Sequence, residues 1–428
     1  MSFELTVLPL EDCLDALIDY RGKTPTKTNS GIPLITAKII KGGRIDTPTE
    51  FIAKDDYVAW MRRGIPEEGD VVLTVEAPLG EVAQLGSEKI ALAQRVVTLR
   101  GKAGLLDSTY LLYLLQTAEI QSQLKSRATG TTVLGIKQSE LRKVTLSLPP
   151  FVLQLIAAAT LKALDDRITL LRETNATLEA IAQALFKSWF VDFDPVRAKL
   201  EGRTPEGMDE ATAALFPDGF EESELGLVPR GWRVGTLANL SHLNPESWTA
   251  KNHPESVAYV DLANAKDNEI AFVTDCEFDE APSRARRVLR DGDTIVGTVR
   301  PGNRSFAFIH EPASNLTAST GFAVLRPSAI ENTEFVYLAA TQDSSIEHLA
   351  HVADGGAYPA VRPDVVSGLQ IVVPDPQVMK AFHAAAASLL AKVSENQSQA
   401  QTLATLRDTL LPRLISGRLR VNEIGYEN

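Results

Sequence analysis

Two stretches of the chain show the hydrophobic spacing of long helices. From residue 153 onward, and again from residue 382, side chains suited to packing recur at alternating steps of four and three. This spacing places them on one stripe of a helix that packs against another helix. We predict helices over 151–191 and 376–420, each the partner of the other. The seam positions are Ala157, Leu161, Leu164, Ile168, Leu171, Asn175, Leu178, Ala182, Leu185 and Trp189 in the first helix, and Phe382, Ala386, Leu389, Val393, Asn396, Ala400, Leu403, Arg407, Leu410 and Leu414 in the second.

Each seam contains one asparagine, Asn175 in the first and Asn396 in the second. A polar residue in a seam commonly fixes the register of two helices at some cost in stability. The alternative is that both are tolerated surface positions.

The remainder of the chain alternates short strand patterns with glycine and proline. Residues 71–75 and 96–99 are β-rich, and a helical pattern follows near 110–124. We therefore predict an α+β fold. The predicted domains are residues 1–150, the central helix 151–191, an acidic Pro/Gly-rich connector 192–231, a second domain 232–375 and the distal helix 376–420.

Landmarks of the first half return in the second half after a step of about 225 residues. Residues 69–73 recur as 292–296 and residues 97–100 as 323–326, and Gly130 has a counterpart in Gly355. A repeat of this length predicts two similar domains related by a pseudo-two-fold axis. Such a molecule presents two similar surfaces to a partner that is itself roughly two-fold.

Composition narrows the classes of function. Cys13 and Cys276 are isolated cysteines, which argues against a disulfide framework or a zinc site. The first residues have no secretory pattern, and no apolar run has the length of about 18 residues that a membrane span needs, so we expect a cytoplasmic protein. The net charge of −12 argues against nucleic acid as a partner. However, arginines cluster at 284–304 in an otherwise acidic half, which leaves room for a local basic patch.

Catalytic motifs are missing from the sequence. Arg21-Gly22-Lys23-Thr24 resembles the end of a phosphate-binding loop, but Leu17 stands where that motif needs glycine. His348 and His351 lack metal-ligand surroundings, and no nucleophile elbow or dinucleotide fingerprint is present. We predict no catalytic residue and no metal site in this chain.

Over nearly its full length, the amino-acid sequence resembles the specificity subunit of type I restriction-modification systems. Any one matching stretch would be weak evidence for this family, but six of them in this order are specific for it. They are DYRGKTP at 19–25, GIPLITAK at 31–38, TVEAPLGEV at 74–82, LPP at 148–150, LFKSWFVDFDP at 185–195 and LLPRLISG at 410–417.

This resemblance implies that DNA recognition and catalysis belong to different subunits. Two target recognition domains would each read half of a bipartite double-stranded DNA sequence, held apart by antiparallel coiled-coil spacer helices. Two methyltransferase subunits and the restriction motor-nuclease subunits would dock on the chain. The chain itself would hold no cofactor, because S-adenosylmethionine, ATP and Mg would be bound by those partners.

Base reading in a groove needs side chains such as Arg, Lys and Asn, while phosphate contacts set the register. The candidates in the first domain are Tyr20, Arg21, Lys23, Lys38, Lys41, Trp60, Arg62, Arg63 and Lys137, and those in the second are Arg284, Arg286, Arg287, Arg300, Asn303, Arg304 and Tyr358.

Several roles have two interpretations. Glu76 and Glu81 are either salt-bridge partners or acceptors for cytosine amino groups. Trp189 and Phe190 either form the core of the helix pair or anchor a methyltransferase. For the whole chain, the alternative to DNA recognition is a duplicated coiled-coil scaffold that binds only proteins. A self-sufficient methyltransferase-restriction enzyme is disfavoured by the missing motifs.

Overall fold

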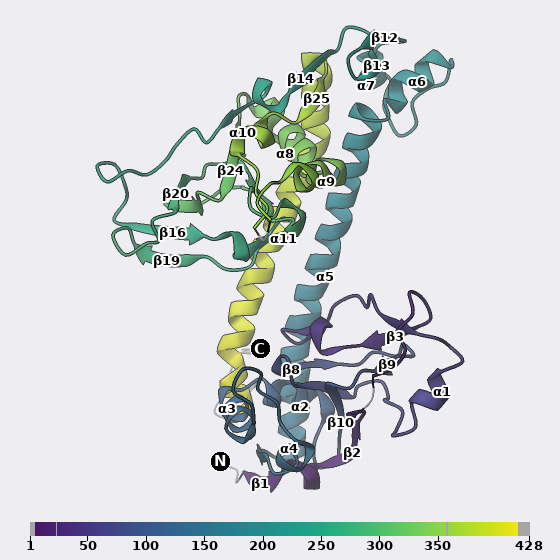
Figure 1. Cartoon of the computed structure of the whole chain (residues 1–428), viewed down its shortest axis with the longest axis vertical. Coiled ribbons are helices and arrows are strands. Elements are labelled where there is room, and N and C mark those ends of the chain that lie inside the picture. Colours follow the sequence, from purple (N-terminus) through teal and green to yellow (C-terminus); the bar gives the residue numbers. More distant parts are fainter. Residues whose placement is uncertain (1–4, 23, 357, 418–428) are drawn as a thin grey trace, which may run out of the picture. The chain divides into compact units, whose positions relative to one another are not determined.

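The computed structural model describes residues 5–22, 24–356 and 358–417. The chain divides into two compact units, Met1–Thr169 with Ala400–Asn428 (unit 1) and Leu170–Gln399 (unit 2). Both units mix helices and sheets, as the α+β prediction requires (Figure 1). Across the described ranges, no helix is both long and apolar enough to span a membrane.

Unit 1 is built on a four-stranded antiparallel sheet with the order β2-β10-β7-β8, beside a smaller sheet with the order β6-β3-β9. Its strands are β1 (Thr6–Pro9), β2 (Leu14–Asp19), β3 (Ile32–Ile35), β4 (Ile40–Lys41), β5 (Arg44–Ile45), β6 (Phe51–Ile52), β7 (Val71–Val75), β8 (Leu79–Gln84), β9 (Ala91–Leu92), β10 (Val96–Gly101) and β11 (Thr145–Leu148). Its short helices are α1 (Tyr57–Trp60), α2 (Ser108–Leu115), α3 (Ala118–Arg127) and α4 (Gln138–Leu141).

Unit 2 repeats this plan. The sheet β15-β24-β21-β22 has the strand order of the large sheet of unit 1, and a second sheet has the order β19-β16-β23-β20. The strands are β14 (Arg233–Thr236), β15 (Ser241–Leu243), β16 (Ser256–Val260), β17 (Ala265–Lys266), β18 (Glu269–Ile270), β19 (Thr274–Glu277), β20 (Ala285–Val288), β21 (Thr294–Gly297), β22 (Phe306–Phe308), β23 (Leu316–Ser319), β24 (Phe322–Pro327) and β25 (Gln370–Val373). The short helices are α8 (Thr333–Thr341), α9 (Asp343–Val352) and α10 (Pro363–Ser367).

The central strands of both large sheets are apolar because they are covered on both faces. Every residue of β7 is buried, and so is every residue of β21. A strand of this kind reads as a continuous hydrophobic run rather than as an alternating one. In both units a parallel pair of the second sheet, β3 with β9 and β16 with β23, extends the core beside the large sheet, which in unit 2 denotes β15-β24-β21-β22.

The same buried ion pair braces each large sheet. In unit 1, Asp70 accepts two hydrogen bonds from Arg100, at 2.8 and 2.9 Å. In unit 2, Asp293 accepts two from Arg326, also at 2.8 and 2.9 Å. Asp293 is fully buried, and burial raises the pKa of its carboxyl, so the arginine is needed to hold the charge.

Two helices of 40 residues, α5 (Phe151–Phe190) and α11 (Pro376–Ile415), each contribute to both units. Within unit 2 they are antiparallel, because Asn175 contacts Val393 and Asn396 while Phe190, further along α5, packs edge-to-face against Phe382, earlier in α11. Within unit 1 the later part of α11 packs against the earlier part of α5, where Arg407 bonds to Asp165 at 2.7 Å.

None of the predicted seam residues is exposed. Phe186 and Leu390 are also buried, at 2% and 1% exposure, although the heptad pattern did not include them. A helix with 3.6 residues per turn drifts by about 20° per heptad, so its contact stripe moves to neighbouring positions. The distal helix ends at Ile415, before the predicted residue 420.

The acidic Pro/Gly-rich connector contains regular secondary structure. It contains α6 (Asp194–Leu200), α7 (Glu210–Ala214) and the hairpin of β12 (Phe220–Ser223) and β13 (Gly226–Pro229). Its aromatic side chains enter the core of unit 2, where Trp189 meets Phe216 at 5.0 Å and Phe190 meets Trp232 at 5.9 Å between ring centroids. Trp189 and Phe190 are 6% and 4% exposed, which favours the core interpretation over the partner anchor.

Candidate nucleic-acid interface

A tight loop at the edge of the large sheet of unit 1 is held by paired backbone hydrogen bonds. Thr129 and Gly135 exchange two of them, at 2.8 and 2.9 Å, and the next residue, Ile136, donates to Val75 at 3.0 Å. Gly130 has a φ of 117°, and a Cβ there would lie 2.1 Å from the carbonyl oxygen of Val133, so only glycine fits. The loop therefore presents Val133 and Leu134 at the surface, 48% and 43% exposed.

Unit 2 has the same loop in the corresponding place. Asp354 and Ala360 exchange two backbone hydrogen bonds, at 3.1 and 2.7 Å, and Val361 donates to Thr298 at 2.9 Å. Gly355 has a φ of 123°, and a Cβ there would lie 2.8 Å from the carbonyl oxygen of Tyr358. The side chain presented here is Tyr358, which is 72% exposed.

Several basic residues of unit 1 gather beside the Val133 loop. Arg21 donates to the carbonyl of Ile136 at 2.6 Å, which places it next to the exposed Lys137. Arg63 donates to the carbonyls of Asp19 and Arg21, at 2.9 and 2.7 Å. The backbone thus brings Arg21, Arg63 and Lys137 to one place, although they are far apart in the sequence.

The other candidates of unit 1 lie in different surroundings. Lys38, Lys41 and Arg62 are exposed, and Lys41 ends the first strand of the β4–β5 hairpin. Lys23 lies outside the described residues.

Tyr20 and Trp60, both candidates for DNA contact, pack against each other within unit 1. Tyr20 is 3% exposed, and its hydroxyl donates to the carbonyl of Gly64 at 2.6 Å. Its ring stacks on Trp60 at 5.7 Å, and the indole N–H of Trp60 donates to Leu92 at 3.0 Å. Both polar groups are therefore satisfied inside the unit, and the ring face of Tyr20 is not available to a base.

The arginines in and next to β20 mostly have partners within the protein. Arg284 donates to Asp261 at 2.7 Å and to the hydroxyl of Tyr259 at 3.0 Å. Arg286 stacks over Phe278, with the guanidinium carbon 4.6 Å from the ring centroid. Burial lowers the pKa of Arg287, whose Nε has no hydrogen-bond partner in the part of the chain that the structure describes. Arg287 is thus the member of this strand best placed to gain from an added anion.

Arg304 is braced by two carboxylates. Its guanidinium lies 2.5 Å from Asp267 and 2.7 Å from Asp343. These two ion pairs tie Arg304 to neighbouring segments of unit 2. Asn303, one residue earlier, is exposed.

Arg300 and Tyr358 are brought together by the Tyr358 loop. The backbone N–H of Arg300 donates to the carbonyl of Pro359 at 2.7 Å. Its guanidinium carbon lies 4.8 Å from the centroid of the Tyr358 ring, within the range of a cation–π contact. Both side chains are exposed, so the pair faces solvent.

The comparisons with known proteins agree with this construction. Residues 11–180 match the type I restriction modification DNA specificity domain. The type I restriction enzyme MjaIX specificity subunit of Methanocaldococcus jannaschii is 26% identical over 370 residues, covering 83% of this chain and 79% of that protein. The HindI specificity subunit of Haemophilus influenzae is 26% identical over 396 residues, covering 78% and 82%.

Residues 11–180 thus carry a type I restriction modification DNA specificity domain, and most of the chain is similar to type I specificity subunits. The crystal structure of the type I S subunit from M. genitalium has a similar fold, with a TM-score of 0.54 and 18% identity over 96% of each chain.

The two glutamates of the specificity-subunit motif at 74–82 have intramolecular partners. Glu76 lies 3.7 Å from Arg95, and Glu81 accepts from the backbone N–H of Gly42 at 2.9 Å. These contacts favour the structural interpretation over hydrogen bonding to cytosine.

Sequence reasoning missed Val133 and Leu134 as surface residues of the specificity domain. The sequence did contain an indication of these residues, because Gly130 and Gly355 occupy equivalent positions of the repeat. The exposed side chains that follow each glycine could have been compared directly. Arg95, close to Glu76, was also not among the candidates.

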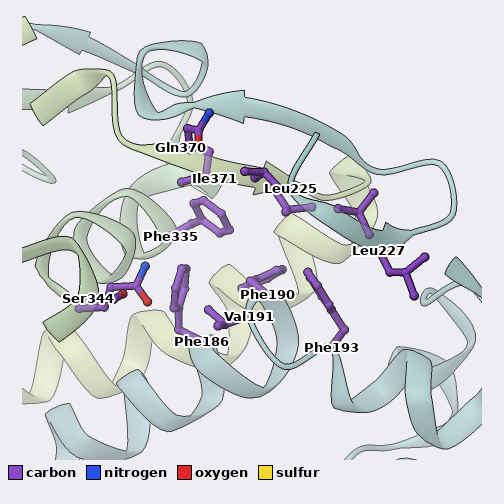
Figure 2. Close-up of a pocket in the computed structure, with 13 residues that line it drawn as sticks. Phe186, Phe190, Val191, Phe193, Leu225, Leu227, Phe335, Ser344, Gln370 and Ile371 are labelled. Atoms are coloured by element: carbon purple, nitrogen blue, oxygen red, sulfur yellow. The ribbon is translucent and has the colours of Figure 1, made fainter. Parts of the chain in front are cut away.

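A pocket of about 260 Å³ lies within unit 2, beside the end of α5 (Figure 2). The rings of Phe186, Phe190 and Phe335 face it, and its lining is apolar apart from Gln342, Ser344 and Gln370. This lining offers shape and apolar contact rather than acid, base or metal chemistry. Among the described residues, no three His, Cys, Asp or Glu side chains gather closely enough to hold a metal ion.

Proposed function

We propose that this specificity subunit is the non-catalytic reader of a bipartite DNA sequence, with one half-site contacted by each unit. The observation that carries the proposal is the repeated construction, in which both units have the same large-sheet order and the same glycine-dependent loop. Because the exposed side chains of the two loops differ, the two half-sites would differ as well.

The two long helices would set the spacing between the half-sites. A helix of 40 residues is about 60 Å long at about 1.5 Å per residue, which exceeds the 34 to 36 Å of one turn of B-DNA. An antiparallel pair with one globular domain at each end would act as a coiled-coil spacer between two pseudo-symmetric recognition domains. The register of the seam would then fix the length of the spacer.

Catalysis would come from partners. Two methyltransferase subunits with S-adenosylmethionine would modify adenine in each half-site, and motor-nuclease subunits with ATP and Mg would cleave unmodified DNA. The names of the curated relatives, which are specificity subunits of restriction enzymes, support this division. The protein would work in the cytoplasm, where its DNA and partners are.

The test is to co-express the full chain with its methyltransferase subunit in a host that lacks adenine methylation, and to sequence the modified bases. We expect methyladenine in one motif with two half-sites separated by a fixed number of unspecified base pairs. A complex that assembles but methylates no bipartite motif would contradict the proposal and favour the alternative, a coiled-coil scaffold that binds only proteins.

A further inference from the structure

Arg300 and Tyr358 stand out among the exposed side chains of unit 2. We propose that they determine specificity at one position of the half-site that unit 2 reads, with Arg300 contacting a guanine and Tyr358 holding the guanidinium in place. The inference rests on the proposed function, because it names residues that would carry the reading of one half-site.

The backbone at Arg300 is held in a conformation that non-glycine residues seldom adopt. Its φ is 47°, in the left-handed region, and it is followed by Pro301. The corresponding residue of unit 1, Ala77, has a φ of 51° and is followed by Pro78. Such conformations persist only where surrounding contacts impose them, and they concentrate at functional sites. Here the imposing contact is the hydrogen bond from Arg300 to Pro359.

This backbone directs the guanidinium onto an aromatic face rather than into the protein. The Tyr358 ring is 72% exposed, so the pair it forms with Arg300 is open to a ligand. A stacked guanidinium loses little rotamer freedom on binding, and its planar fork matches the O6 and N7 acceptors of guanine.

Unit 1 carries a different pair on the same scaffold. Ala77 occupies the place of Arg300, and Val133 occupies the place of Tyr358. Neither side chain can hydrogen-bond to a base, although Val133 can contact the methyl group of thymine. The guanine contact would therefore belong to one half-site, and the equivalent position of the other would lack it.

The experiment repeats the methylome with the complete methyltransferase complex carrying Arg300→Ala, Arg300→Lys, Tyr358→Ala or Tyr358→Phe. Arg300→Ala should reduce the preference for guanine at one position of one half-site by roughly 10- to 100-fold. Arg300→Lys should relax the same position, because lysine keeps the charge but loses the fork. Tyr358→Ala should relax it partly, while Tyr358→Phe retains the ring and should keep the motif.

Arg362→Ala is the matched control, because Arg362 is exposed, lies close to Tyr358 in the sequence and pairs with Asp364. It should leave the motif unchanged. A motif unchanged in both Arg300 variants would overturn the inference while leaving the proposed function intact, and so would relaxation in both half-sites. A wild-type complex without any bipartite motif would remove the proposed function and this inference together. The lysine and phenylalanine variants keep the test decisive if an alanine variant fails to assemble.

Discussion

At the scale of single residues, we expect Glu179 to make the stability of unit 2 depend on pH. Its carboxylate on α5 accepts from the amide of Asn268 at 2.6 Å, and burial, followed by the nearby Asp267, raises its pKa above 4.5. The folded protein therefore binds this proton more tightly than the unfolded chain does. The stabilising contribution is complete below pH 4.5 and is lost as the pH rises through the raised value.

Glu179→Gln should remove this loss, because the amide oxygen still accepts from Asn268 but carries no charge. We expect the variant to gain unfolding free energy relative to wild type as pH rises from about 4 to about 8, at about 1.4 kcal/mol per tenfold difference in proton affinity. Urea unfolding at both pH values measures this gain. Glu173→Gln, at an exposed position of the same helix, is the control. If Glu179→Gln changed the unfolding free energy by the same amount at both pH values, the prediction would be contradicted.

The arginines show how far the sequence could define the interface. The clustering of arginines at 284–304 suggested a local basic patch, but it could not distinguish arginines paired within the protein from arginines that bind DNA. The carboxylates that hold Arg284 and Arg304 lie 23 to 39 residues away in the sequence, and only the fold brings them close. Arg300 differs from Arg304 in its surroundings, because its guanidinium lies over the exposed Tyr358 ring, whereas that of Arg304 lies over the buried Phe306 ring and between two carboxylates. Those distinctions depend on tertiary structure.

At the scale of helices, Asn175 and Asn396 form a buried amide pair. The amide nitrogen of Asn396 donates to the side-chain oxygen of Asn175 at 2.8 Å, and Asn175 donates to the carbonyl of Val393 at 3.0 Å. These contacts exclude the alternative that both are surface positions. The register role itself is a hypothesis that substitution can test.

We expect Asn175→Leu to lower the unfolding free energy by about 1 to 3 kcal/mol, because it leaves buried polar groups of Asn396 and Val393 without their partner. Replacing both asparagines by leucine should recover most of this loss, since an apolar seam needs no hydrogen bonds. A double-mutant cycle from chemical denaturation measures the coupling. Gln399→Leu, at an exposed position of α11, is the control. If the change in unfolding free energy of the double variant equals the sum of the changes in the two single variants, the two asparagines do not act as a coupled pair.

The long helices were the elements most readily predicted, because their signal is local and repeated over many turns. The short strands β4, β5, β17 and β18 have only two residues each, so no periodicity could indicate them. The connector was predicted only as an acidic Pro/Gly-rich segment, and the structure shows the packing of Phe216 against Trp232, which directly follows the connector. The overall composition of such a segment reflects mainly its solvent-exposed side chains, whereas a few aromatic residues fix the segment to the core.

At the scale of the whole molecule, the proposed spacer role predicts how a shorter protein would read DNA. The contacts of Asn175 with Asn396 and of Asp165 with Arg407 indicate which parts of the helices face each other within each unit. Residues 166–172 of α5 and residues 400–406 of α11 lie in the sequence between these two sets of contacts. Deleting seven residues from each helix preserves the alternation of fours and threes, because a heptad is one full repeat of the seam.

Each deletion removes about 10.5 Å of helix, equivalent to about three base pairs of B-DNA. We expect the deleted protein, in complex with its methyltransferase, to methylate the same two half-sites with a spacer about three base pairs shorter. Arg167→Ala, which keeps the length of the helix, is the control and should leave the spacer unchanged. Methylome sequencing of both variants decides the outcome. If the deleted protein assembles and retains the original spacing, the helices do not act as the ruler, because the half-site separation would then be independent of their length.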